Sequence, residues 1–157
     1  MQEKPMRRKD RQRSREEGLA ILKNCEYGIL STVDADGQPY GTPLSYIVKD
    51  NKVYFHSAMN GHKIDNIKGN PKACFTVVGG TKPVYADNFS TYFESVVIFG
   101  NVSEVSDEKE KYDILYELAE RYLPDYMDKA DGDIKHSLSR TAVYGVEMEV
   151  VTVKAKR

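Results

Sequence analysis

The segment from Val53 to Val78 constrains the fold more than any other part of the chain. Its pattern predicts a strand, a polar turn, a short helix from about His62 to Lys68, and a second strand. The basic pair His62 and Lys63 stands where the helix begins, although the helix dipole favours acidic residues there. Together with Gly61, which lets a ligand approach the backbone, this start is typical of a phosphate site. The turn alone fits a solvated helix end equally well.

Size and composition suit one domain over residues 1–157, since 40% of the residues are hydrophobic and 30% are charged. No apolar run approaches the roughly 20 residues of a membrane helix, and no secretory signal is visible, so we expect a cytoplasmic protein without membrane contact. Cys25 and Cys74 lack metal or redox spacing, and the three histidines lack metal-ligand spacing. We therefore predict no metal site.

Residues 1–13 form a basic N-terminal arm, and the first 15 residues hold seven Lys or Arg residues against two acidic ones. Basic arms can bind nucleic acid. Here no aromatic residue lies between the charges, and the rest of the chain is acidic. The sequence therefore favours a solvated arm, or one that lies across a partner subunit, and nucleic acid is not the expected partner.

Six apolar, β-prone segments are separated by turn signals, of which the dipeptide Asp36-Gly37 is the strongest. The predicted strands are Tyr27 to Val33, Tyr40 to Val48, Lys52 to Ser57, Lys72 to Val78, Thr91 to Val105 and Thr141 to Val153. The segments Gly79 to Ser90 and Asp125 to Ser139 are expected to be mainly irregular. Helices are predicted after Ser14 and after Ser106 as well as at His62. Without βαβ alternation, the pattern favours an antiparallel barrel with helices outside it.

Several polar residues could join the anion site. His56 and Ser57 end the strand before the turn, and Pro43 lies inside a predicted strand, where it indicates an edge or a bulge. An edge protected against aggregation is the alternative for Pro43, and a structural role is the alternative for His56. The chain shows no catalytic triad, so any chemistry would belong to a bound cofactor.

The chain resembles the FMN-binding split barrels of the pyridoxamine 5'-phosphate oxidase-like family, most closely the nitroimidazole-resistance branch. The resemblance is carried by the motifs Tyr54-Phe55-His56-Ser57-Ala58, Gly61-His62-Lys63, Asn66-Ile67, Asn70-Pro71, Pro43-Leu44-Ser45-Tyr46 and Tyr92-Phe93-Glu94-Ser95. It implies a mainly β fold with peripheral helices, a six-stranded antiparallel split β-barrel, and a homodimer with FMN at the interface.

The same resemblance implies the roles of individual residues. Gly61, His62 and Lys63 would hold the FMN phosphate, with His56 and Ser57 lining the same site. The strand Pro43, Leu44, Ser45 and Tyr46 would lie along the isoalloxazine, and Ser95 would lie near the flavin.

The implied function is an FMN-dependent, NAD(P)H-using reductase of small acceptors such as nitroaromatics. A non-catalytic protein that binds or stores FMN or haem is the alternative. Pyridoxamine phosphate oxidation is less expected, because the oxidase's C-terminal segment carries Trp and Arg and this chain has no Trp.

Overall fold

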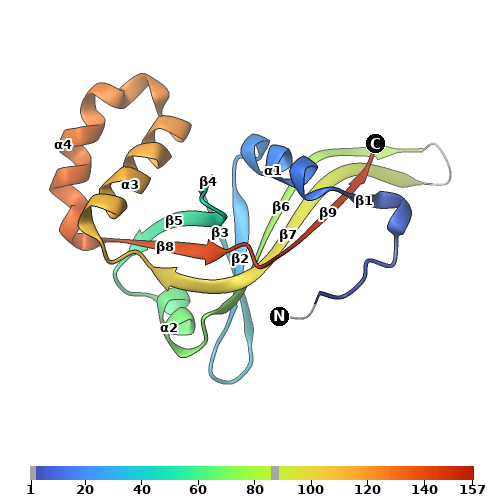
Figure 1. Cartoon of the computed structure of the whole chain (residues 1–157), viewed down its shortest axis with the longest axis horizontal. Helices are drawn as coiled ribbons and strands as arrows, with labels where there is room; N and C mark the ends of the chain where they lie inside the picture. Colours follow the sequence, from blue (N-terminus) through green and yellow to red (C-terminus); the bar gives the residue numbers. More distant parts are fainter. Residues whose placement is uncertain (1–2, 86–88) are drawn as a thin grey trace.

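The computed structural model describes residues 3–85 and 89–157. These residues form an antiparallel nine-stranded sheet with helices packed on its outside (Figure 1). The strands are β1 (Gln12–Arg13), β2 (Gly28–Val33), β3 (Pro39–Leu44), β4 (Ile47–Lys49), β5 (Lys52–Ala58), β6 (Lys72–Val84), β7 (Ser90–Glu104), β8 (Thr141–Glu147) and β9 (Val150–Lys156). The α-helices are α1 (Arg15–Asn24), α2 (His62–Gly69), α3 (Glu108–Tyr122) and α4 (Met127–Ser137). The mainly β class with peripheral helices is therefore confirmed.

The sheet curls but does not close. Its strand order is β3-β2-β6-β7-β8-β5-β4, so the two ends of the order, β3 and β4, follow one another in the chain without pairing. Only Ser45 and Tyr46 separate them. This break is the split of the barrel. The long strand β7 holds the halves together, because it pairs with β6 and β9 along one part and with β8 at its end.

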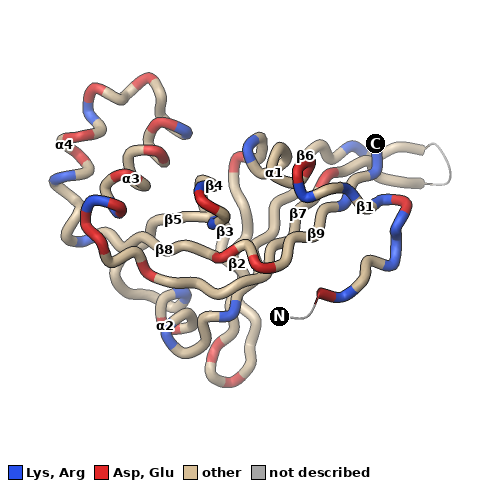
Figure 2. Tube along the Cα trace, viewed as in Figure 1, with Lys and Arg blue, Asp and Glu red and all other residues tan. Residues whose placement is uncertain are grey.

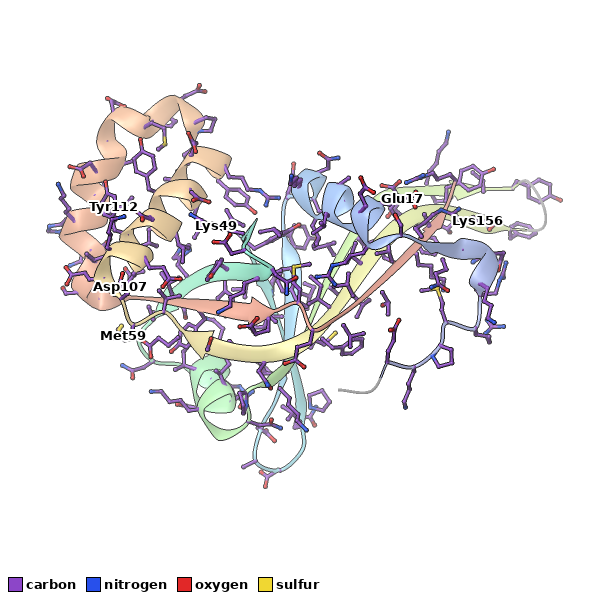
Figure 3. All side chains as sticks on the ribbon, in the orientation of Figure 1. Glu17, Lys49, Met59, Asp107, Tyr112 and Lys156 are labelled. Atoms are coloured by element: carbon purple, nitrogen blue, oxygen red, sulfur yellow. The ribbon has the colours of Figure 1, made fainter. Side chains whose placement is uncertain are left out.

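Two apolar clusters stabilise the fold. The barrel interior is filled by fully buried residues such as Leu22, Leu30, Phe55 and Phe75. A second cluster lies outside the barrel, where α3 and α4 cover β4, β5 and β8 through residues such as Ile114. The hydroxyl of Tyr112 on α3 donates to Asp131 on α4 at 2.7 Å and links the two helices (Figure 3).

The prediction of six strands was wrong in its count. The predicted strand Tyr40 to Val48 divides into β3 and β4, and Thr141 to Val153 divides at Met148 and Glu149 into β8 and β9. Neither break contains Gly or Pro. Both are set by long-range pairing, since the two halves join different neighbours in the sheet.

Two segments expected to be irregular are ordered instead. β6 continues past Gly79 to Val84, and a register shift between Gly79 and Lys82 absorbs the irregular sequence. Residues 86–88 of that segment lie outside the described residues. Most of Asp125 to Ser139 is the helix α4, which buries only Ala130 and Ile134 against its neighbours. None of the described helices is long and apolar enough to cross a membrane.

Candidate functional site

The helix α2 begins at an open, uncapped turn. Gly61 is its N-cap and has φ +139°, a conformation that L side chains rarely adopt. A Cβ at this position would meet no atom within 4 Å. No side chain among the described residues caps the helix. The first N–H groups of α2 therefore face open space, as a phosphate site at a helix start requires.

Lys63 follows in the first turn of α2 and is partly buried. Burial lowers the pKa of its ammonium group. Within the described residues Lys63 forms no ion pair, whereas Lys52, which is also partly buried, pairs with Glu147 at 2.9 Å. A partly buried cation without a protein anion is suited to an anionic ligand.

His56 lies beside this cation at the end of β5. Desolvation of its ring, followed by the positive charge of Lys63, lowers the pKa of His56. Side chains alternate along β5, so His56 lies on the same face as Tyr54, which packs with α3 and α4. Ser57 lies on the opposite face with Phe55 and points into the barrel. His56 is therefore a neutral imidazole at pH 7, near Lys63 but on the outer side of the strand.

Two buried hydroxyl groups have no partner among the described residues. They are Oγ1 of Thr42 on β3 and Oγ of Ser57 on β5. Leaving a buried polar group unsatisfied costs about 1–3 kcal/mol. Thr42 lies on β3, which borders the split, and Ser57 lies on β5 beyond the part that pairs with β4. A polar ligand that enters the split could satisfy both groups. The ring of Tyr40, two residues before Thr42, packs at a tilted angle against the ring of His62, with centroids 4.1 Å apart.

A pocket of about 380 Å³ opens between the sheet and the two outer helices. Ser45, beside the split, and His56 line its sheet side, and Ser137 and Thr141 add hydroxyl groups. The other lining residues are Leu115, Leu118, Ala119, Tyr122, Leu123, Asp133 and Ile134. An apolar pocket with a few polar groups is typical of a small-molecule site.

Tyr46 does not line the site as expected, since its side chain is fully buried in the core. Its hydroxyl donates to the carbonyl of Leu22 at 2.6 Å, and its N–H donates to the hydroxyl of Tyr122 at 3.0 Å. Its carbonyl accepts from Arg121 at 2.9 Å. Because its polar groups already have protein partners, Tyr46 positions the break between β3 and β4 and is not available to a ligand.

Ser95 lies far from the strand of Pro43 in this chain. It lies on β7, three strands from β3 in the order of the sheet, which corresponds to about 14 Å. Pro43 pairs with Ile29, Ile29 with Thr76, and Thr76 with Val97, so these four residues lie on one face of the sheet. Ser95, two residues from Val97 on β7, lies on the same outer face as Pro43. Leu44, by contrast, packs against the barrel core.

The structure therefore gathers Ser45, His56, Ser57 and the turn Gly61–Lys63 around the split. Sequence reasoning missed Tyr40 and Thr42. Period-two alternation in β3 could have found them, because it places Tyr40, Thr42 and Leu44 on one face. The described residues contain no group of three or more side chains able to hold a metal ion.

A family model described as pyridoxamine 5'-phosphate oxidase matches residues 14–155. The chain belongs to this family. Among solved structures, a candidate 5-nitroimidazole antibiotic resistance protein from Bacteroides thetaiotaomicron is 26% identical with a TM-score of 0.76, covering 90% of this chain and 83% of that one. A search of curated proteins found no match.

Two more distant members of this structural group share the fold. The flavocytochrome Anf3 from Azotobacter vinelandii is 22% identical with a TM-score of 0.79, covering 98% of this chain and 72% of that one. The haem storage protein HutZ from Vibrio cholerae is 17% identical with a TM-score of 0.65, covering 90% of this chain and 95% of that one. At these identities the likeness concerns the fold alone.

Proposed function

We propose that the chain binds FMN with its phosphate on the N-terminus of α2, and that it passes electrons from NAD(P)H to small acceptors such as nitroaromatics. The observation that carries the proposal is Lys63, a partly buried cation that lacks an anionic partner among the described residues. A monophosphate ester carries about −1.5 to −2 charges at neutral pH. Lys63 and the first N–H groups of α2 would hold that charge.

The orphaned hydroxyl groups of Thr42 and Ser57 support a polar ligand in the split. The open space at Gly61 supports close contact between the phosphate and the backbone. FMN is favoured over a dinucleotide because the chain has no Gly-x-Gly-x-x-Gly motif after a strand. Likeness to a candidate nitroimidazole resistance protein supports nitroaromatic acceptors.

Bound flavin would supply hydride and electron transfer. The pocket between the sheet and α3–α4 would hold the apolar acceptor and exclude water from it. His56, neutral at pH 7, would present a ring nitrogen to the polar groups of the acceptor at the edge of the pocket. Ser45 would fix the acceptor through a hydrogen bond.

We further propose that the active species is a homodimer with FMN at the interface. Ser95 and Pro43 share a partly exposed face of the sheet yet lie far apart in one chain. A second copy could bring its own Ser95 to the split of the first. Sedimentation equilibrium should give twice the mass of the chain, and a monomer that binds FMN fully would contradict this proposal.

The function is tested by the visible absorption spectrum of the purified protein and by titration with FMN. We expect flavin absorption bands, or their appearance with quenched flavin fluorescence after FMN is added. Oxidation of NADH or NADPH should then depend on a nitroaromatic acceptor. A colourless protein that does not bind FMN would refute the proposal.

A non-catalytic role in binding FMN or haem is a second candidate, favoured by His56 itself. A neutral imidazole beside an apolar pocket is the ligand type that holds haem iron in many proteins. Titration with haem should give a Soret band that shifts in His56→Ala if this candidate is correct. Steady acceptor-dependent NAD(P)H oxidation with FMN bound would exclude it.

A further inference from the structure

A basic surface lies at the end of the sheet away from α3 and α4 (Figure 2). β1 pairs with β9, with Gln12 opposite Lys154, and this lays the N-terminal arm along the C-terminal strand. We call residues 3–13 and 151–157 the arm–strand surface. It holds nine Lys or Arg residues and two acidic residues, a net charge of +7, whereas the whole chain has a net charge of −1.

Acidic residues neutralise only part of this charge. Asp10 pairs with Arg8 and lies 3.9 Å from Arg11, and Arg157 pairs with Glu94 at 2.8 Å and with Glu17 at 3.4 Å. Arg13 donates to backbone carbonyls. Five further cations form no ion pair with the described residues, although Lys156 donates to the hydroxyl group of Ser90. These cations are Lys4, Arg7, Lys9, Lys154 and Lys156.

The fold adds the aromatic residues that the arm itself lacks. Lys154 Nζ lies 5.7 Å from the ring centroid of Phe93, and Lys156 Nζ lies 5.9 Å from that of Tyr92. Both rings are partly exposed on β7, and Lys156 lies near the C-terminal end of β9 (Figure 3). Cations that follow a backbone beside rings on which bases stack are the combination found in single-strand-binding proteins.

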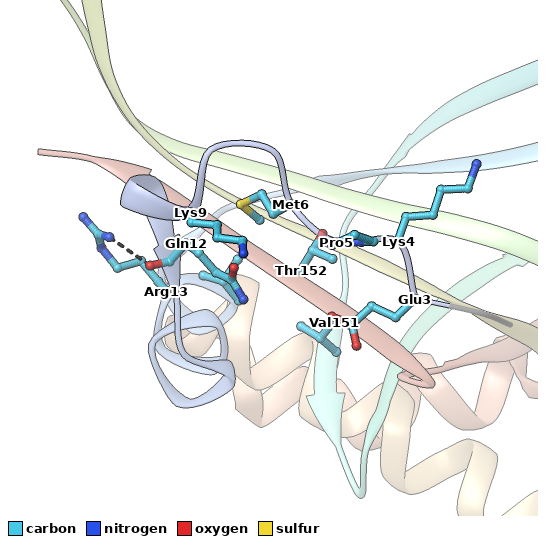
Figure 4. Close-up of a pocket in the computed structure, with 10 residues that line it drawn as sticks. Glu3, Lys4, Pro5, Met6, Lys9, Gln12, Arg13, Val151 and Thr152 are labelled. Atoms are coloured by element: carbon cyan, nitrogen blue, oxygen red, sulfur yellow. Dashed lines mark hydrogen bonds between the residues drawn. The ribbon is translucent and has the colours of Figure 1, made fainter.

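The surface is also hollowed. A pocket of about 350 Å³ lies between the arm and β9 (Figure 4). Lys4, Lys9 and Arg13 line it, together with the acidic residue Glu3 and the apolar side chains of Met6 and Val153. A cavity of this size lies in the range of small-ligand sites, so one nucleotide can enter it.

From these observations we propose that the arm–strand surface binds single-stranded nucleic acid. The cations would contact phosphates, and Tyr92 would stack on an unpaired base, which a duplex would not offer. Phe93, the next residue of β7, points to the opposite face of the sheet and would not contact the same base. None of these residues lines the pocket at α3–α4. Lys154 lies opposite Ser95, on the sheet face that the proposed homodimer would use, so the oligomeric state of each variant is measured as well.

Fluorescence anisotropy of a labelled short oligothymidylate with the full-length protein tests the proposal. We expect the logarithm of the association constant to fall linearly with the logarithm of the salt concentration, with a slope of about −0.7 for each phosphate contact. The double variant K154A/K156A should bind more weakly, with a slope smaller by about 1.4. Tyr92→Ala should weaken binding at least about fivefold and leave the slope unchanged.

The matched control is K109A/K135A, which removes two cations from α3 and α4 and changes the net charge equally. It should bind like the wild type. Equal losses in both double variants, no binding at low salt, or tighter binding to a duplex of the same length would overturn the proposal. Binding to anionic phosphatidylserine vesicles with the same dependence on Lys154 and Lys156, without oligonucleotide binding, would also overturn it. Circular dichroism of each variant checks that it is folded.

Discussion

The ring of Tyr40 packs against the ring of His62 in a tilted arrangement, with centroids 4.1 Å apart and an interplanar angle of 32°. This contact joins the edge strand β3 to the first residue of α2 and so fixes one side of the proposed phosphate site. Tyr40→Leu should weaken FMN binding by about two- to tenfold, since an aromatic pair is worth about 0.5–1.5 kcal/mol. Tyr40→Phe, which keeps the ring, should bind FMN like the wild type. Titration of both variants by flavin fluorescence measures the difference.

The lowered pKa of His56 makes stability depend on pH. The unfolded state takes up the proton at a higher pH than the folded state, so the free energy of unfolding should fall as pH decreases below about 6.5. Above that pH both states hold neutral His56 and its contribution is flat. The free energy of unfolding, measured with urea between about pH 5 and 7.5, should therefore fall less towards acid pH in His56→Gln than in the wild type. Parallel curves for the two proteins would contradict this assignment.

Arg121 holds the break between β3 and β4 from the side of α3. Its guanidinium donates to the carbonyls of Tyr46 at 2.9 Å and Leu22 at 3.2 Å and lies 4.5 Å from the ring of Tyr46. Arg121→Met should lower the free energy of unfolding by about 1–3 kcal/mol, because several partly buried carbonyls lose a charged donor. The exposed Arg140 offers the control, and Arg140→Met should leave urea unfolding nearly unchanged. A loss for Arg121→Met no larger than that of the control would argue against this role.

Local signals predicted much of the fold. Ser14 and Glu17 form the expected capping box, with hydrogen bonds of 3.1 Å in both directions. Glycine is required at position 100 of β7, because a Cβ there would lie 1.8 Å from the carbonyl oxygen of Glu147. Such features depend on residues close in sequence, or on glycine where two backbones approach.

The errors have a common physical origin in long-range contacts. Tyr46 follows an apolar strand pattern, but its hydroxyl bonds to Leu22, which is 24 residues away, and this holds it in the core. The helix α4 buries too few apolar residues to show a helical stripe in the sequence. Ser95 could not be placed relative to His62, because that requires the order of the strands in the sheet.

The central claim is that Lys63 and the start of α2 hold a flavin phosphate. Isothermal titration of FMN and of riboflavin, which lacks the phosphate, tests it most directly in the wild type and in Lys63→Met, with Lys68→Met on the exposed side of α2 as the control. The wild type and Lys68→Met should prefer FMN over riboflavin by at least about tenfold, as a charged hydrogen bond predicts. This preference should largely disappear in Lys63→Met. Equal affinities for FMN and riboflavin in the wild type, or an unchanged preference in Lys63→Met, would contradict the account.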